Sequence, residues 1–197
     1  MPKADKDLEK LEHVVLVNEQ DEELGLAEKA TVHTTETPLH RAFSLFLFNS
    51  RGELILQQRA HHKKTWPGVW SNSVCGHPQR GESYVAAAQR RLSFELGLDI
   101  PAGDIHMMLP NYRYRYEHKG VVENEFCPVM AVFIDVEPKP NPEEVAETRW
   151  IAWRQFLSDI QQDNEYSEWC VEEAQLLQEK PEFRKMFEEF TGQPSSN

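Results

Sequence analysis

Clustered hydrophobic residues predict two neighbouring strands in the first third of the chain. The apolar runs 42–48 and 53–58 flank residues 49–52, Asn-Ser-Arg-Gly, which are typical of a tight turn. We therefore expect a β-hairpin, the clearest element in the sequence. Further on, the Ala-rich residues 83–96 carry apolar side chains at helical spacing and are followed by Gly97, which predicts a helix that ends at this glycine.

The remaining pattern predicts strands and helices on either side of a long polar loop. Residues 61–81 combine aromatic, basic and turn-forming residues, and loops of this length inside a compact domain are often functional. A polar, Pro-rich connection at 137–144 is too short to separate two large domains. The other expected elements are strands at 12–18, 113–116 and 127–136, and helices at 153–161, 167–178 and 182–190. This order indicates an α/β or α+β layered domain.

The composition indicates one globular domain over residues 1–197, with flexible ends at about 1–8 and 192–197. The formal net charge of -12 argues against a general nucleic-acid-binding protein, although it leaves room for a local basic pocket. The N-terminus has no apolar signal-peptide core, and no apolar run approaches the ~18 residues of a membrane span. Three cysteines are too few for a disulfide framework. We therefore expect a cytoplasmic protein with reduced thiols and with no membrane or nucleic-acid partner.

The loop 61–81 and the predicted helix after it contain a spaced set of glycine and acidic residues. Gly76, Glu82 and Glu95, with the residues around them, resemble the Nudix box, a loop–helix–loop that binds a divalent cation and a diphosphate. The box usually has glutamate where this chain has Arg91 and Phe94, and the loss of two carboxylates disfavours ordinary Nudix hydrolysis. Arg91 and Glu95 lie four residues apart on one helical face. They are either a surface ion pair, or a phosphate-binding arginine beside a glutamate that holds Mg²⁺.

A second group of candidate residues combines carboxylates with imidazoles. Glu123 and Glu125 are two residues apart, so on a strand they point to the same face, either solvated or with a cation between them. His33, His40 and His77 add three imidazoles to this pair. Together they are a plausible set of three nitrogen and two oxygen ligands for Mn²⁺, Zn²⁺ or Fe²⁺, rather than an all-oxygen Mg²⁺ site.

The sequence resembles one family over most of its length. The stretches TPLHRAFSLFLFN, KKTWPGVWSNSVCGHPQRGES, RRLSFELG, YRYRY and VENEFCPV, between about Lys29 and Trp169, are similar to the type I isopentenyl-diphosphate isomerases. The resemblance implies a Nudix fold, with a mixed sheet between helices, extra N-terminal strands and C-terminal helices. It also implies conversion of isopentenyl diphosphate to dimethylallyl diphosphate through a tertiary carbocation, by a protein that we expect to be monomeric. The alternative function is a Nudix hydrolase of a nucleoside diphosphate derivative.

The same resemblance implies a role for each candidate residue. Cys75 is the active-site thiol, and Glu125, helped by Tyr114, is the acid. An aromatic side chain that covers the carbocation matches Trp169, although Glu168 stands before it where we expect a proline. The residues implied to bind ligands are His33, His40, His77, Glu123 and Glu125 for Mn²⁺ or Zn²⁺, Glu95 and the Cys75 carbonyl for Mg²⁺, and Lys29, Arg59, Lys63 and Arg91 for the diphosphate.

Overall fold

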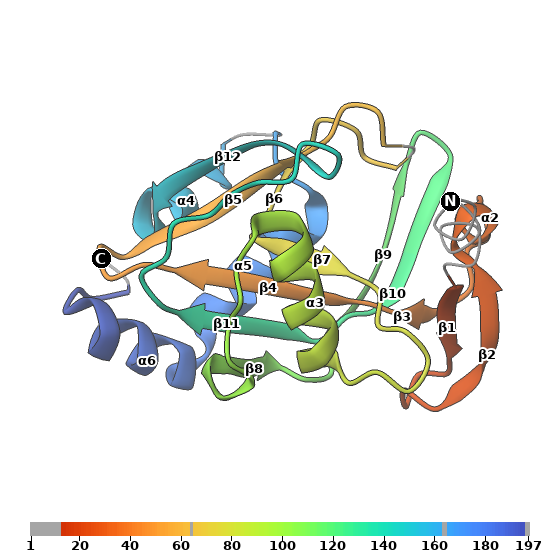
Figure 1. Ribbon diagram of the computed structural model, residues 1–197, viewed down its shortest axis with the longest axis horizontal. Helices are drawn as coiled ribbons and strands as arrows, with labels where there is room; N and C mark the ends of the chain where they lie inside the picture. The colour runs from red at the N-terminus through yellow and green to blue at the C-terminus, as the bar shows by residue number, and fades with distance from the viewer. Residues whose placement is uncertain (1–12, 64, 163–164, 196–197) are drawn as a thin grey trace, which may run out of the picture.

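The computed structural model describes residues 13–63, 65–162 and 165–195, which form two sheets and the helices around them (Figure 1). The first elements are β1 His13–Val17, β2 Glu23–Glu28, α2 Lys29–Val32, β3 His40–Arg41, β4 Phe43–Phe48, β5 Glu53–Arg59, β6 Trp70–Ser71 and β7 Val74–Gly76. They are followed by α3 Tyr84–Leu96, the 3-10 turn Ala102–Asp104, β8 Ile105–Leu109, β9 Arg113–His118, β10 Val121–Phe126, β11 Val129–Phe133 and β12 Val145–Ala152. The last elements are α4 Trp153–Asp159, α5 Glu168–Glu179 and α6 Pro181–Thr191.

The larger sheet lies between α3 on one face and the C-terminal helices on the other (Figure 1). Its strand order is β12-β5-β4-β11-β8, with β6 paired to β5 and β7 paired to β4. Because β4 and β11 are parallel and the other pairs are antiparallel, the sheet is mixed. The predicted α+β class, with a mixed sheet between helices, is confirmed.

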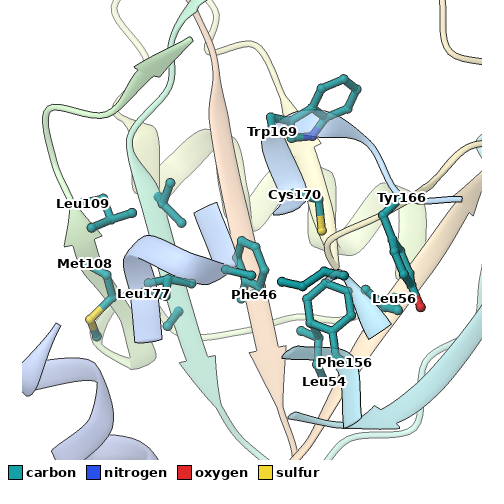
Figure 2. Packing of buried hydrophobic residues seen from close by; sticks show 14 of the residues in the cluster. Phe46, Leu54, Leu56, Met108, Leu109, Phe156, Tyr166, Trp169, Cys170 and Leu177 are labelled. Carbon is teal, nitrogen blue, oxygen red and sulfur yellow. The ribbon is translucent and has the colours of Figure 1, made fainter. Parts of the chain in front are cut away.

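The two faces of this sheet are buried because β4 is apolar on both sides. Its residues Phe43, Leu45 and Leu47 pack towards α3, whereas Phe46 and Phe48 pack towards α4, α5 and α6. Strands buried on both faces read as continuous apolar runs, as this one does. Figure 2 shows the second face, where Phe46 and the β5 residues Leu54 and Leu56 lie beside Phe156 of α4 and Cys170 and Leu177 of α5.

The predicted hairpin of β4 and β5 is only partly correct. The two strands pair at Phe48 and Leu54, next to the turn, and do not continue as a ladder. Beyond this point β7 pairs with β4, and β6 pairs with β5. The long loop after β5 therefore folds back into the sheet and takes over the hydrogen bonds that a simple hairpin would make. A short-range turn signal predicts the turn but not the partner of each strand beyond it.

The smaller sheet has the order β2-β1-β3-β10-β9 and contributes most of the candidate metal ligands. In it, β10 pairs in parallel with β3 and antiparallel with β9, so Glu125 lies opposite His40 on one side and Tyr114 on the other. The resemblance implied extra N-terminal strands, and this sheet contains them, but the residue pattern did not predict β2 and β3 individually. The strands β8 and β12 and the short helix α2 were also missed.

Most predicted helices and strands are confirmed near their expected bounds. Helix α3 begins after Ser83, whose side chain accepts a hydrogen bond from the Ala86 backbone N–H, and ends at Gly97 with φ 64°. The predicted strands at 12–18, 113–116 and 127–136 correspond to β1, β9 and β11, and the three C-terminal helices to α4, α5 and α6.

Parts of the chain ends lie outside the described residues, including residues 1–8 and 196–197, which were predicted to be flexible. Ser195 is buried, and its hydroxyl donates a hydrogen bond to Glu188 of α6 (3.2 Å). Among the helices in the described part of the chain, none is long and apolar enough to cross a membrane.

Candidate active site

Four of the predicted metal ligands converge on one point beside the smaller sheet. His33 follows α2, His40 lies on β3, His77 follows β7 and Glu123 lies on β10. Each side chain offers one ligand atom, and these atoms all lie within 4.8 Å of one another. Residues that are up to 90 positions apart in the chain are thus brought together by the pairing of β10 with β3 and by the position of β7.

The atoms at this point are buried and lack ordinary partners. His33 Nε2, His40 Nε2 and Glu123 Oε2 are buried without a hydrogen-bond partner among the described residues. The His33 Nε2–Glu123 Oε2 contact is 3.1 Å long but does not have hydrogen-bond geometry. Because unpaired buried polar atoms are costly, such a group is typical of a ligand-binding site rather than of a packed core.

The orientation of His40 fits a metal ligand. Its Nδ1 lies 2.9 Å from the Pro38 carbonyl oxygen, so Nδ1 carries a proton, and Nε2 faces the cluster, where it can be a ligand when the ring is neutral. The three imidazole rings are packed with centroids 5.1–5.9 Å apart. Burial also lowers the pKa of His77 to about 3, so this imidazole is neutral, as a metal ligand must be. The donor set therefore fits a divalent metal ion.

Glu125 lies at the edge of this cluster and connects it to Tyr114. Its Oε1 is 3.0 Å from His77 Nε2 and 3.6 Å from His40 Nε2. Its Oε2 accepts a hydrogen bond from the Tyr114 hydroxyl at 2.6 Å. Burial alone would raise the pKa of Glu125, but its interactions with the neighbouring imidazoles of His40 and His77 outweigh burial and hold the pKa well below its usual range. Burial and the Glu125 charge raise the pKa of Tyr114, so its hydroxyl remains a donor.

Cys75 lies on β7, directly opposite Ser44 on β4. Its sulfur donates a hydrogen bond to Asn72 Oδ1 at 2.9 Å and lies 3.5 Å from the Ser44 hydroxyl oxygen. Burial, and then the nearby carboxyl group of Glu173, raise the pKa of Cys75 to about 12. The thiol is therefore protonated and is held between two polar side chains. Asn72 and Ser44 hold the thiol in position, so its orientation does not depend on a contact with His77.

Trp169 lies in the first turn of α5 and covers Tyr114. The two rings are stacked, with centroids 5.7 Å apart and an interplanar angle of 13°, and Trp66 packs edge-on against Trp169 at 5.4 Å. Trp66 is buried and has φ 44°, a backbone conformation that is strained for a bulky residue. Trp169, which the resemblance matched to the aromatic residue that covers the carbocation, thus lies beside the Glu125–Tyr114 pair.

The predicted diphosphate-binding residues form ion pairs within a partly buried network. Arg91 Nε donates to Glu95 Oε1 at 2.7 Å, and Arg91 Nη2 donates to Glu144 Oε2 at 2.9 Å. Lys63 Nζ lies 2.7 Å from the other oxygen of Glu144. Arg91 and Glu95 therefore form an ion pair inside the protein, in which Glu95 is buried and Arg91 is partly buried.

The other two basic residues lie near this network or near the histidines. Arg59 donates hydrogen bonds to the backbone and side-chain oxygens of Thr65, both at 3.3 Å. The positive charge of Lys29 is close enough to His77 to lower the pKa of that imidazole. Lys29 thus belongs to the histidine side of the site.

Three polar residues at the site were missed from the sequence. Glu144 bridges Lys63 and Arg91, and it lies in the Pro-rich connection that was interpreted only as a linker. The Gln57 side-chain amide donates to Glu95 Oε2 at 2.9 Å, and its own Oε1 is buried without a partner among the described residues. Asn72 lies in the SNSVCGHP stretch, between the short strands β6 and β7, and its side chain binds Cys75. Its position three residues before Cys75 was the sequence feature that could have indicated this role.

Known proteins similar to this chain indicate its family. A family model described as NUDIX domain matches residues 38–170. The chain is 49% identical over 171 residues to an isopentenyl-diphosphate Delta-isomerase of Saccharopolyspora erythraea. This alignment covers 86% of this chain and 87% of that protein. It is 47% identical to a protein of the same name from Klebsiella pneumoniae, over 83% of this chain and 89% of the relative.

Solved structures support the fold. A crystal structure of a Deinococcus radiodurans protein superposes with a TM-score of 0.67 at 24% identity, covering 83% of this chain and 98% of that chain. The MutT protein of Methanosarcina mazei superposes with a TM-score of 0.57 at 16% identity, over 76% of this chain and 95% of that chain. From the sequence relatives and the family match, the chain carries a NUDIX domain and belongs to the isopentenyl-diphosphate Delta-isomerase family.

Proposed function

We propose that this protein converts isopentenyl diphosphate to dimethylallyl diphosphate in two proton transfers: one proton is added to the terminal alkene carbon, and another is removed from the CH₂ group on the other side of the carbon that becomes cationic. The single observation that carries the proposal is the hydrogen-bonded Glu125–Tyr114 pair beside a three-histidine cluster. The Cys75 thiol lies close enough to this pair for the Glu125 charge to raise the pKa of the thiol. Two separate proton-carrying groups on one buried site suit a reaction that needs an acid and a base.

The residues of the site divide the reaction between them. The Tyr114–Glu125 pair supplies the proton on one side of the alkene, and Cys75 acts on the other. Protonation of an unactivated alkene gives a tertiary carbocation, which must be shielded from water. Trp169, a buried ring beside Tyr114, is proposed to stabilise that cation, by about 2 kcal/mol when the cation is desolvated.

Metal ions complete the proposed site. His33, His40, His77, Glu123 and Glu125 would hold one Mn²⁺ or Zn²⁺, because imidazole and carboxylate ligands suit these ions. A bound cation would compensate the two carboxylate charges and increase the acidity of the Glu125–Tyr114 pair. Glu95, with the Cys75 carbonyl, would hold the Mg²⁺ that accompanies the diphosphate.

The diphosphate is a binding handle and is not cleaved. Lys29, Arg59, Lys63 and Arg91 are proposed to hold it, so that its binding energy keeps the alkene in register with the acid and the base. Arg91 and Lys63 are at present paired with Glu144, so the substrate phosphate would compete with this carboxylate for both cations. We expect the protein to act as a cytoplasmic monomer on this small-molecule substrate.

Incubation with isopentenyl diphosphate in deuterated water tests the proposal directly. With Mg²⁺ and Mn²⁺ present, deuterium should appear in dimethylallyl diphosphate and in the recovered substrate, as followed by NMR and mass spectrometry. The Cys75→Ala variant is the control, since it lacks the proposed group on one face of the alkene. Release of phosphate or of a nucleotide from nucleoside diphosphate derivatives, without isomerisation, would favour the hydrolase alternative instead.

A further inference from the structure

A chain of buried polar side chains leads from the start of α5 to the Cys75 thiol. Its members are Ser167, the residue before α5, Ser71 on β6 and Asn72, which directly follows β6. Each of these three residues is at most 3% exposed. Buried polar groups are costly unless they are hydrogen-bonded, so a row of them needs a full set of partners. The proposed mechanism assigns no role to the two serines.

The orientation of the Asn72 amide is fixed by its neighbours. Its Nδ2 donates to the backbone carbonyl oxygens of Leu45 and Val74, both at 3.1 Å. Because carbonyl oxygens only accept hydrogen bonds, the amide nitrogen must lie on this side and Oδ1 on the other. Oδ1 accepts two hydrogen bonds, from the Ser71 hydroxyl at 2.8 Å and from the Cys75 thiol at 2.9 Å. The amide thus uses both of its donors and both lone pairs of its oxygen.

The same counting sets the direction of the hydrogen bond between Ser71 and Ser167. Their hydroxyl oxygens lie 3.0 Å apart, and the geometry of this pair allows either to be the donor. A hydroxyl has one proton, and that of Ser71 is directed to Asn72, so Ser167 is the donor in this pair. The chain therefore runs from Ser167 through Ser71 to the Asn72 oxygen, where it meets the proton of the thiol. Hydrogen bonds in such chains polarise and strengthen one another.

Backbone pairing, rather than helix capping, holds Ser167 in this place. Its N–H donates to the Trp70 carbonyl oxygen at 2.9 Å, and Tyr166 forms a parallel β-bridge with Trp70. A serine before a helix usually accepts a hydrogen bond from the first turn, but the Ser167 side chain makes no such bond to the described residues of α5. Its hydroxyl is directed to Ser71 instead, and two residues later the chain reaches Trp169 (Figure 2).

We propose that Ser167 is a positioning residue for Cys75. Through Ser71 and Asn72, it fixes the direction of the thiol proton. The chain also connects the thiol to the segment that carries Trp169, so the group that acts on the alkene and the ring that faces the carbocation are held in one arrangement. This inference rests on the proposed function, because it concerns the orientation of the thiol that works on one face of the alkene.

Substitution of the two serines tests this role and leaves in place Asn72, which also supports the backbone of β4 and β7. Ser71→Ala and Ser167→Ala each remove one buried hydroxyl group from the chain. We expect kcat to fall about three- to tenfold in each variant, roughly the effect of one hydrogen bond, with KM within about twofold. Adding Ser167→Ala to Ser71→Ala should change kcat by less than about 1.5-fold, because the chain is already broken.

The matched control is Ser73→Ala. Ser73 is as buried as the residues of the chain and follows Asn72 directly. Its hydroxyl donates to the Ile55 carbonyl oxygen at 2.7 Å and accepts from the Leu47 N–H at 2.8 Å, so its hydrogen bonds lead away from the thiol. We expect this variant to be destabilised, as measured by its melting temperature, but to keep kcat within about twofold of wild type.

Infrared spectra of the S–H stretch report the hydrogen bond of the thiol without any turnover. The band of Cys75 is obtained as the difference between each protein and the same protein with Cys75→Ala. It should shift or broaden in Ser71→Ala and in Ser167→Ala, because the acceptor of the thiol proton has lost part of its support. It should stay unchanged in Ser73→Ala. Melting temperatures and far-UV circular dichroism check that each variant is folded.

Several outcomes would overturn the inference. These are an unchanged Cys75 band in the two chain variants, unchanged kcat, a loss confined to KM, additive effects of the two substitutions, or an equal loss of kcat in Ser73→Ala. Failure of the wild-type protein to isomerise isopentenyl diphosphate would instead refute the proposed function, while the S–H band would still show whether the serines orient the thiol.

Discussion

Replacing Tyr114 with phenylalanine removes one hydroxyl group from the site and leaves the ring in place. The lost interaction is the 2.6 Å hydrogen bond to Glu125 Oε2, in a pair where both side chains are buried. A hydrogen bond to a charged group contributes about 1.5–3 kcal/mol, which corresponds to a roughly 10- to 150-fold decrease in kcat if the bond acts in the transition state. The stacking on Trp169 should survive, since phenylalanine keeps the aromatic face.

The assay measures dimethylallyl diphosphate formation over a range of substrate concentrations, so that kcat and KM are obtained separately. KM should change by less than about threefold, because the residues proposed to hold the diphosphate do not include Tyr114. Tyr116→Phe is the matched control, since Tyr116 lies two residues along the same strand and its hydroxyl donates to Glu172 instead. Turnover of Tyr114→Phe within threefold of wild type, or an equal loss in Tyr116→Phe, would refute the reasoning.

Three further substitutions test other parts of the site and fold. Cys75→Ala should decrease kcat by about 10²- to 10⁴-fold with a melting temperature near that of wild type, and near-normal turnover would contradict the assignment of the thiol. Glu123→Gln should weaken Mn²⁺ or Zn²⁺ binding by at least tenfold, since even the loss of a group that only hydrogen-bonds to a metal ligand has roughly this effect. Metal content after dialysis measures the binding, and an unchanged content would contradict the ligand assignment. Burial would raise the pKa of Glu82, but hydrogen bonds from Arg90 and from the Gln79 backbone outweigh burial and lower this pKa. The stabilising contribution of Glu82 is therefore present above the ordinary carboxyl pKa, and it is lost as the pH falls through the lower pKa of the folded state. Glu82→Gln should therefore lower the free energy of unfolding by about 1 kcal/mol at pH 7 and by less at pH 3, in urea titrations, whereas a constant difference would contradict the linkage.

The sequence pattern predicted a strand or helix correctly where the signals for that element lie within or next to its own residues. Strand β4 is apolar at nearly every position, and α3 has a capping serine before it and a glycine after it, so both were predicted near their bounds. The separation of β4 from β5 was not predictable in this way. It depends on residues 74–76 pairing with β4, and the turn after Phe48 contains no information about that distant partner.

The candidate site divides along the same line. His40 was a candidate from the pattern of histidines and carboxylates, and the role of Cys75 came from the resemblance. The structure brings His40 into a cluster with His33, His77 and Glu123, and Cys75 lies close enough to interact with the Glu125 carboxylate. Glu144 was missed because a polar, Pro-rich segment looks like a linker when its spatial neighbours are unknown.

The strand pairings that build the site also have a consequence for folding. Ser44 pairs with Val129 on β11, and His40 pairs with Glu125 on β10, so each contact closes about 85 residues of chain. Parallel pairings between such distant segments require large loops to close before any contact is gained, and they form slowly. The thiol, the acid and the histidines therefore come together only once the chain is almost completely folded. Partly folded forms would retain helices such as α3 but would have no assembled site, so recovery of activity should lag behind recovery of helical circular dichroism during refolding.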